Sequence, residues 1–150
     1  MKEKNEKITI GRVDVLDFPD WGLHNVRAKI DTGAYTSSIH CTKIKLLKDK
    51  RLSFYLPAHK GQKRKRFITD EFELKSVKNS FGQSELRYVV KTSVILFREE
   101  IKAEFSLADR TSMRFPVLLG RKFLSNRFLV DVSLENLSQQ EKQKLAFTKA

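Results

Sequence analysis

The chain has 150 residues, 40% of them hydrophobic and 32% charged, a composition typical of one compact, soluble globular domain. This composition excludes a disordered chain, and the apolar runs are too short to span a bilayer, so we expect no membrane association. The formal net charge of +12 favours acidic partners, such as nucleic acid, anionic lipid or an acidic polypeptide, although a merely basic surface explains it equally well. The single cysteine, Cys41, excludes an intramolecular disulfide and agrees with a reducing cytoplasm.

The first half of the chain is predicted to form short strands. Residues 1–7 are polar and precede no apolar signal segment, so we expect a flexible leader on a cytoplasmic protein. Apolar residues then recur at strand spacing in four segments, of which the third changes phase once. These segments are residues 8–18, with Gly11 as a bulge or turn, 26–30, 37–47 and 52–56.

A β-hairpin is the clearest element of the second half. Residues 88–96 and 101–107 both alternate between apolar and polar side chains, and a turn is expected over 98–100. Alternation over two neighbouring segments is typical of paired strands with one buried face. The sequence therefore predicts that these strands lie side by side in a sheet.

Helix is expected in only two places. A short turn over 121–125 follows Gly120, and Ser138 with Glu141 has capping-box spacing at the start of a short C-terminal helix. Many short strands with little helix predict an all-β barrel or sandwich. The predicted organisation is a flexible leader, one domain and a helical tail, over residues 1–7, 8–135 and 136–150.

A candidate catalytic turn follows the apolar segment 26–30. Asp31 ends that strand, Thr32 offers a hydroxyl that can fix the turn, and Gly33 lets backbone amides approach the carboxylate. Two carboxylates that share a proton can activate water and protonate a carbonyl, whereas one alone is a poor catalyst. Because the chain has only one such turn, a two-fold homodimer would bring two copies of Asp31 together. Taken alone, the tripeptide is also a common turn sequence.

A second segment strengthens the catalytic interpretation. Residues 117–119 are large and apolar, Gly120 follows, and a short helix is expected next, which indicates a buried strand passing under the first turn. The sequence Asp-Thr-Gly-Ala at 31–34, combined with apolar-apolar-Gly-Arg at 118–121, resembles the paired signature of retropepsin-like aspartic proteases. The resemblance implies an all-β, retropepsin-like closed barrel.

The resemblance also implies roles for the residues of these two segments. Asp31 is the catalytic residue, Thr32 builds the hydroxyl network between subunits, and Gly33 supports the turn and its approach to substrate. Gly120 supports the turn from below, and Arg121 is structural, at the edge of the dimer or the helix. Ala34, which completes the signature, is assigned to substrate binding.

The match is closer to one bacterial subgroup, labelled ATP-dependent zinc proteases or retropepsin-like peptidases associated with ATP-grasp glutamate ligases. It covers most of residues 8–133, and Gly11-Arg12 near the start also fits. The segments that carry it are residues 28–34, 36–40, 87–89, 105–110 and 115–124. The resemblance implies an association with an ATP-grasp ligase and makes a glutamate-rich peptide an attractive substrate.

Neither zinc nor ATP is supported by the residues themselves, so we expect no cofactor. The chain has no His-Glu-x-x-His motif, and its histidines are His24, His40 and His59. His40 and Cys41 are adjacent, so their side chains would point to opposite faces of a strand, which does not suit a shared metal. The chain also lacks a Gly-x-x-x-x-Gly-Lys-Ser/Thr phosphate-binding loop.

A basic segment at residues 58–66 has three interpretations. Five of its nine residues are Lys or Arg, and the plainest interpretation is a solvated loop. A nucleic-acid patch is less favoured, because the loop contains no aromatic residue for base stacking. In retropepsins a hairpin flap after the catalytic turn closes over substrate, and a basic flap carrying Lys63 and Arg64 would recruit an acidic peptide. Residues 79–84, with Gly82 at a hairpin tip, are a competing flap candidate.

Two further residues are candidates for substrate binding. Arg87 can hold a substrate carboxylate by two parallel hydrogen bonds, or it pairs with Asp109 or Glu104 at the strand edge. His40 either touches substrate or tunes Asp31, or is simply a strand residue near the active turn.

The leading interpretation is an aspartic peptidase that acts as a homodimer. The alternative is a non-catalytic module of the same fold that binds a peptide or a partner enzyme. The segment between Asp31 and Gly120 is longer than in the compact viral enzymes, so the cleft could be reshaped. A helical tail in place of terminal strands would also require a different dimer interface.

Overall fold

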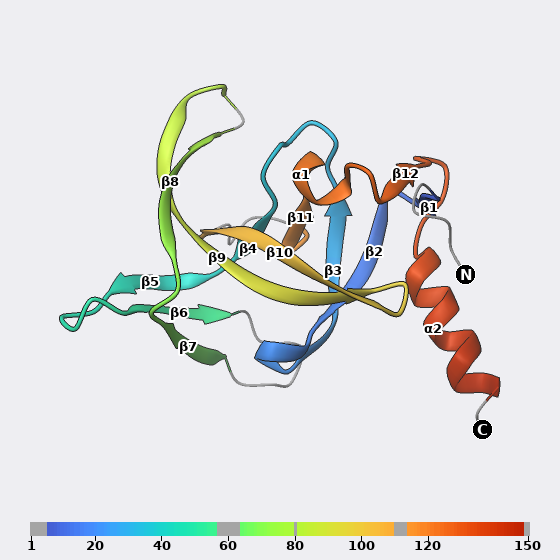
Figure 1. The fold of residues 1–150 in the computed structure, drawn as a ribbon, viewed down its shortest axis with the longest axis horizontal. Helices are drawn as coiled ribbons and strands as arrows, with labels where there is room; N and C mark the ends of the chain where they lie inside the picture. The colour runs from blue at the N-terminus through green and yellow to red at the C-terminus, as the bar shows by residue number, and fades with distance from the viewer. Residues whose placement is uncertain (1–5, 57–63, 80, 110–113, 149–150) are drawn as a thin grey trace.

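The computed structural model describes residues 6–56, 64–79, 81–109 and 114–148 (Figure 1). Among the described residues, six strands close into a ring in the order β10-β4-β11-β3-β2-β9, because β9 also pairs with β10. The prediction of an all-β closed barrel is therefore confirmed. The six strands are β2 (Val13–Phe18), β3 (Leu23–Ile30), β4 (Ser38–His40), β9 (Ser84–Leu96), β10 (Glu99–Ala108) and β11 (Val117–Leu119).

The barrel core follows the alternation seen in the sequence. In β10 the side chains of Ile101, Ala103, Phe105 and Leu107 are buried, and Lys102 between them is exposed. In an extended strand successive side chains point to opposite faces, so one face of β10 points into the core. The β9–β10 hairpin was predicted, although its turn is tighter than the expected 98–100.

That turn consists of Phe97 and Arg98 alone, because Leu96 pairs directly with Glu99. Both turn residues have positive φ, 51° and 65°, which is the backbone conformation that a two-residue type I′ turn requires. Such turns usually carry Asn or Gly, so no sequence signal marked this one. The ring of Phe97 packs on that of Phe128 with centroids 6.0 Å apart, which helps to hold the turn.

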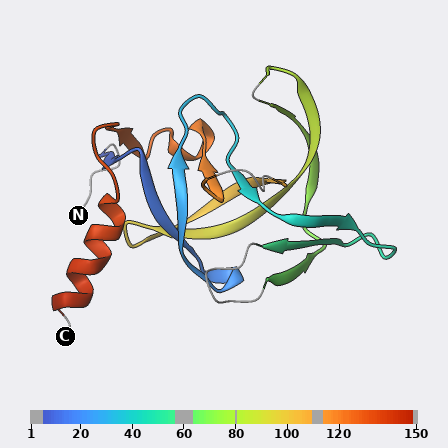
Figure 2. The same ribbon diagram turned by 180° about the vertical axis from the view of Figure 1, so that it is seen from behind.

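Strand β11 threads between two strands from the first third of the chain. It runs parallel to β3, with Val117 beside Ala28, and antiparallel to β4 on its other side. All three residues of β11 are buried. Figure 2, seen from the opposite side, shows the orange segment of β11 and α1 next to the light-blue arrow of β3. The end of β11 is thereby brought next to the end of β3, where Asp31 follows.

A second sheet extends the barrel core. It contains β5 (Thr42–Leu46), β6 (Leu52–Leu56) and β7 (Lys65–Thr69) in that order. Trp21 of the short 3-10 helix η1 (Pro19–Trp21) packs on Phe18 of the barrel and on Phe54 and Phe67 of this sheet. The strand expected over 37–47 is two strands, β4 and β5, and its change of phase is the place where the chain leaves the barrel for this sheet.

Among the described strands, β8 (Glu73–Lys78) pairs with β9 alone. Together they form a long, twisted hairpin that projects beyond the barrel, as the curved green and yellow ribbons of Figure 1 show. Neither β7 nor β8 was expected from the sequence. The side chains of both strands are either exposed or half-buried, and none is fully buried. Neither strand therefore has the strongly apolar face that marks a core strand.

The two chain ends meet on one side of the barrel. The β1 strand (Ile8–Ile10) pairs in parallel with β12 (Phe128–Val130). The predicted interruption at Gly11 is the break between β1 and β2, where a Cβ atom would collide with the Leu134 carbonyl oxygen. No helix in the described ranges has the length and apolar character needed to cross a membrane.

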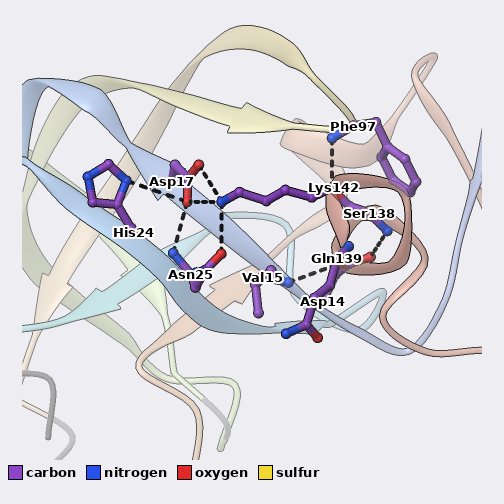
Figure 3. A network of polar contacts seen from close by, with 9 residues as sticks. All are labelled: Asp14, Val15, Asp17, His24, Asn25, Phe97, Ser138, Gln139 and Lys142. Carbon is purple, nitrogen blue, oxygen red and sulfur yellow. Dashed lines mark hydrogen bonds and ion pairs between the residues drawn. The ribbon is translucent and has the colours of Figure 1, made fainter. Parts of the chain in front are cut away.

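The C-terminal helix α2 (Leu137–Thr148) forms as expected, but without the predicted capping box. The helix begins one residue before Ser138, so Ser138 lies inside its first turn. The Ser138 hydroxyl accepts a hydrogen bond from the Phe97 N–H at 2.8 Å. The buried carboxylate of Asp14 on β2 instead accepts hydrogen bonds from the N–H groups of Ser138 and Gln139, at 2.9 and 3.1 Å (Figure 3).

Candidate active site

The Asp31 carboxylate is held by the backbone of its own turn. The Asp31 N–H donates to the Leu119 carbonyl at 2.9 Å, which ties the turn to β11. One carboxylate oxygen, Oδ1, accepts the Gly33 N–H at 3.1 Å, and the Asp31 carbonyl accepts the Ala34 N–H at 3.2 Å. The partly exposed carboxylate therefore has a fixed orientation, with its second oxygen left for other contacts.

Gly120 lies directly beneath this turn. A Cβ atom at Gly120 would lie 2.6 Å from the Tyr35 carbonyl oxygen and 2.9 Å from that of Ala34, so no side chain fits. The Gly120 N–H donates to the Ser37 hydroxyl at 3.0 Å. The close approach of these backbones requires glycine at this position.

The short helix α1 (Arg121–Leu124) fastens the turn from the same side. The Arg121 N–H donates to the Ala34 carbonyl at 2.8 Å, and the Lys122 N–H to the Tyr35 carbonyl at 2.9 Å. The Arg121 side chain reaches further and donates from Nη1 to the Thr32 carbonyl at 2.9 Å. Its guanidinium also lies over the Tyr35 ring, 5.8 Å from the centroid. Arg121 thus contacts the turn itself.

A pair of buried serines completes the support, and sequence reasoning missed it. Ser37 is 2% exposed, and its carbonyl accepts the Ser106 N–H at 2.9 Å. Ser106 lies on β10 and pairs with Ser38 of β4. Because these contacts join residues far apart in the chain, only the alternation of polar with apolar residues on β10 could have marked Ser106.

A cleft of about 1100 Å³ opens beside the turn. Asp31, Gly33 and Ala34 line it on the barrel side. Val77, Lys78 and Gly82 line it from the β8–β9 hairpin. Of the two flap candidates, the segment 79–84 therefore borders the cleft. The basic segment 58–66 falls mostly outside the described residues, and Lys63 with it.

Arg64 is described, and it is not among the residues that line the cleft. It precedes β7, whose first residue, Lys65, places its Nζ 3.3 Å from the Cβ position of Gly22. Gly22 precedes β3 and Asp31 follows it, so this part of the basic segment lies toward the other end of β3. Binding of substrate by Lys63 and Arg64 stays a prediction, and for Arg64 this geometry does not favour it.

The cleft is rich in positive charge. Its described cations outnumber its carboxylates, and they are Lys29, Lys78, Arg87 and Arg121 against Asp31 and Asp109. A concave surface with one dominant sign of charge concentrates oppositely charged ligands and steers their approach. The lining therefore favours an anionic ligand over a cationic one.

Arg87 lines the cleft, but its partner is neither Asp109 nor Glu104. Its Nε donates to Glu85 Oε1 at 2.6 Å, and its Nη2 contacts the same oxygen. The side chain of Arg87 is 14% exposed and that of Glu85 is 44% exposed. A ligand carboxylate could replace the more exposed Glu85 as the partner of this guanidinium.

His40 lies next to the cleft rather than in it. Its Nδ1 is 4.0 Å from Asp109 Oδ1, and Asp109 does line the cleft. The neighbouring Cys41 thiol is buried, and burial, aided by the charge of Asp109, raises its pKa so that it stays protonated. In the described part of the chain, no three His, Cys, Asp or Glu side chains gather as metal ligands.

This closed barrel carries an aspartate turn that rests on a buried strand, a glycine and a short helix, and a hairpin borders the cleft beside the turn. That combination defines a retropepsin-like protein. The family model described as "Retropepsin-like aspartic endopeptidase RimB" matches residues 9–141. The chain belongs to this RimB-like family.

Curated relatives of the chain carry a different name. A "Probable alpha-L-glutamate ligase" of Desulfotalea psychrophila is 31% identical over 99% of this chain. One of the same name from Shewanella pealeana is 35% identical over 86% of it. The chain spans only about a third of these relatives, 34% and 29% of their lengths.

A solved structure shares the fold. The crystal structure of a Legionella pneumophila protein of unknown function superposes with a TM-score of 0.71. The match covers 89% of this chain and 99% of that one, at 24% sequence identity. At this identity the likeness supports the barrel and its topology alone.

Proposed function

We propose that this protein is an aspartic peptidase that acts as a homodimer, with one Asp31 from each chain. The observation that carries the proposal is the Asp31 carboxylate, held by the Gly33 N–H at the edge of a large cleft. A fixed, partly exposed carboxylate is the group that an acid–base mechanism needs. Membership in a family of retropepsin-like endopeptidases supports the same assignment.

The proposed mechanism uses two Asp31 carboxyl groups that share one proton. Two carboxylates at close range repel each other, so the pair can share one proton. The ionised Asp31 takes a proton from water as the water oxygen attacks the scissile carbonyl. The protonated Asp31 gives its proton to the carbonyl oxygen. Breakdown of the tetrahedral intermediate then breaks the C–N bond: the Asp31 that took a proton from water gives it to the leaving amine, and the other Asp31 takes a proton back from a hydroxyl of the intermediate.

The exposed side of the turn is where a second copy would sit. Thr32 and Gly33 are exposed, and Tyr35 is 59% exposed. The Thr32 hydroxyl can then join a hydrogen-bond network across the two-fold axis, and an isologous contact places both copies of Asp31 together. One chain supplies one such carboxylate, so the proposed site is incomplete without the partner.

The substrate class we propose is an acidic peptide. The cations of the cleft include Lys78 and Arg87 from the hairpin and Arg121 from the barrel. Arg87 is paired with the more exposed Glu85, and in this proposal a substrate carboxylate takes the place of Glu85. The relatives named as alpha-L-glutamate ligases support glutamate-rich peptides and an association with such a ligase.

The test compares wild type, Asp31→Asn and a matched control, Asp49→Asn, on glutamate-rich and mixed peptide libraries between pH 4 and 8. Asp49 is an exposed carboxylate in a turn that also binds a backbone N–H, that of Arg51. Products are identified by mass spectrometry. We expect cleavage by wild type and Asp49→Asn, and a loss of at least about 100-fold in Asp31→Asn. Undiminished cleavage by Asp31→Asn would contradict the proposal.

A second candidate function is a non-catalytic module that binds an acidic peptide or a partner ligase. The observation that favours it is that the matched region forms about a third of longer proteins named as ligases. In that case neither wild type nor Asp31→Asn cleaves any peptide. Both then bind glutamate-rich peptides with equal affinity, and Arg87→Gln weakens the binding.

A further inference from the structure

A second cavity, of about 380 Å³, lies behind the segment that follows the catalytic turn. Thr36 and Ser37 form one side of it, and Thr36 also lines the catalytic cleft. The other sides come from the outer face of the β9–β10 hairpin and from α1 with the residues after it, and the buried ring of Phe123 contributes an apolar surface.

This cavity has a strong excess of positive charge. Its charged lining residues are Lys91, Lys102, Lys122, Arg127 and a single carboxylate, Glu104. Glu104 already binds Lys122 at 2.7 Å and lies 3.7 Å from Lys91 and 3.4 Å from Lys75. Glu104 is therefore shared among three lysines, of which Lys75 lies outside the cavity and also contacts Glu73 at 3.3 Å.

Two of the cations, Lys102 and Arg127, contact no carboxylate among the residues that the structure describes. In the described ranges, no Asp or Glu oxygen lies within 4 Å of Lys102 Nζ or of the Arg127 guanidinium. Arg127 donates to the Phe123 carbonyl at 3.2 Å and lies over the Phe123 ring, 5.9 Å from its centroid. That contact fixes the guanidinium at the cavity while leaving most of its donors free.

We propose that this cavity binds a phosphate group. Four cationic residues and Thr36 line this cavity, which suits a compact anion with three or more acceptor oxygens. The cavity has about a third of the volume of the catalytic cleft, so a small anion fits it better than an extended acidic chain does. The phosphate can be free or can belong to a nucleotide.

The position of the cavity couples it to the turn. Lys122 contributes its side chain to the cavity while its N–H holds the Tyr35 carbonyl. A phosphate that draws Lys122 away from Glu104 therefore acts on a residue that fastens the catalytic turn. The inference concerns binding, and it stands whether or not the protein cleaves peptides.

Binding is tested by calorimetric titration with inorganic phosphate, pyrophosphate and ATP, at an ionic strength held constant with sodium chloride to remove simple screening. The ¹⁵N–¹H signals of Thr36 and Ser37 are followed in parallel. We expect one saturable site, with the largest shifts at these amides. Lys102→Gln should weaken binding by about tenfold, because it removes a charged donor on an exposed side chain.

The control is Lys45→Gln, an equally exposed lysine on β5, outside the cavity. It should bind phosphate like wild type. Tighter binding of ATP than of inorganic phosphate would assign the phosphate to a nucleotide, and equal binding would assign it to the free ion. The proposal is overturned by heats that do not saturate, by equal loss in Lys45→Gln, or by hexaglutamate binding more tightly than phosphate and shifting the same amides.

Discussion

Gly120 is required by crowding rather than by its backbone conformation. Its φ of −94° and ψ of 179° are open to any residue, but the carbonyl oxygens of Tyr35 and Ala34 occupy the space of a side chain. Sequence reasoning could find this glycine, because it stands between an apolar strand and a short helix. The serines that complete the support, Ser37 and Ser106, had no comparable local signal.

Gly120→Ala should therefore destabilise the protein by about 1–3 kcal/mol, the usual cost of inserting a group into a packed site. The added methyl must push the Tyr35 carbonyl away, which also weakens its bond from the Lys122 N–H. Urea unfolding measures the change. Gly82→Ala is the comparison, because open space surrounds Gly82 and only its φ of +77° opposes a side chain. A smaller loss at Gly120 than at Gly82 would contradict this account.

Glu104 should make stability depend on pH in the acid range. The hydrogen bond from Lys122 lowers the pKa of Glu104, its burial opposes this, and the charges of Lys122 and Lys75 add to the lowering. A carboxyl whose pKa is lower in the folded state stabilises the fold above its unfolded pKa, about 4.3. That contribution is lost as pH falls through the folded value.

The free energy of unfolding of wild type should therefore fall more steeply below about pH 5 than that of Glu104→Gln. Urea unfolding at a series of pH values gives the comparison. Glu71→Gln, at an exposed position outside any strand, is expected to keep the wild-type slope. Equal slopes for wild type and Glu104→Gln would show that the ion pairs of Glu104 contribute nothing to folding.

Helix α2 is attached to the barrel by polar groups. Asp14 is 1% exposed and accepts N–H groups from the first turn of α2, while Lys142 donates to Asp17 at 2.8 Å and to Asn25 at 2.8 Å (Figure 3). A carboxylate at a helix N-terminus satisfies donors that have no partner within the helix. The helix was predictable, but its cap lies 124 residues away along the chain, so local pattern pointed to Ser138 instead.

Asp14→Ala should detach α2 while leaving the barrel intact. The change leaves the Ser138 and Gln139 N–H groups without an acceptor, at a cost of about 1–3 kcal/mol. Hydrogen exchange read by mass spectrometry should show faster exchange over α2 than over β9 and β10. Asp70→Ala, at an exposed bend, is the control and should leave α2 protected. Unchanged protection of α2 in Asp14→Ala would contradict the role of the buried carboxylate.

Some of the strands and turns could be predicted from the sequence, and others could not. Strands with a continuous apolar face, such as β3 and β10, were found because the barrel buries that face. β7 and β8 were not predicted, because neither strand has a fully buried face. Hydrogen bonding to a neighbouring strand, rather than burial, determines where they form. The Phe97-Arg98 turn lacks Gly and Asn, so only the register of the two strands determines it.

For the whole molecule, the proposed function requires a pair of chains. Sedimentation in the presence of a bound peptide should give twice the 17.5 kDa of one chain. Thr32→Ala should weaken the pair, because Thr32 is exposed on the turn and its hydroxyl is assigned to the contact between subunits. Thr42→Ala, on β5 away from the turn, serves as the control. A chain that stays monomeric while it cleaves peptides would rule out the shared site.

The threading of β11 between β3 and β4 also has a consequence for synthesis. The ribosome makes the Asp31 turn before the strand and glycine that organise it, and the Arg121–Thr32 contact spans 89 positions. Contacts of such long range form late in folding. A nascent chain that has not yet released residues 117–121 therefore carries its carboxylate in an unsupported loop, so any hydrolytic activity must wait until that part has emerged.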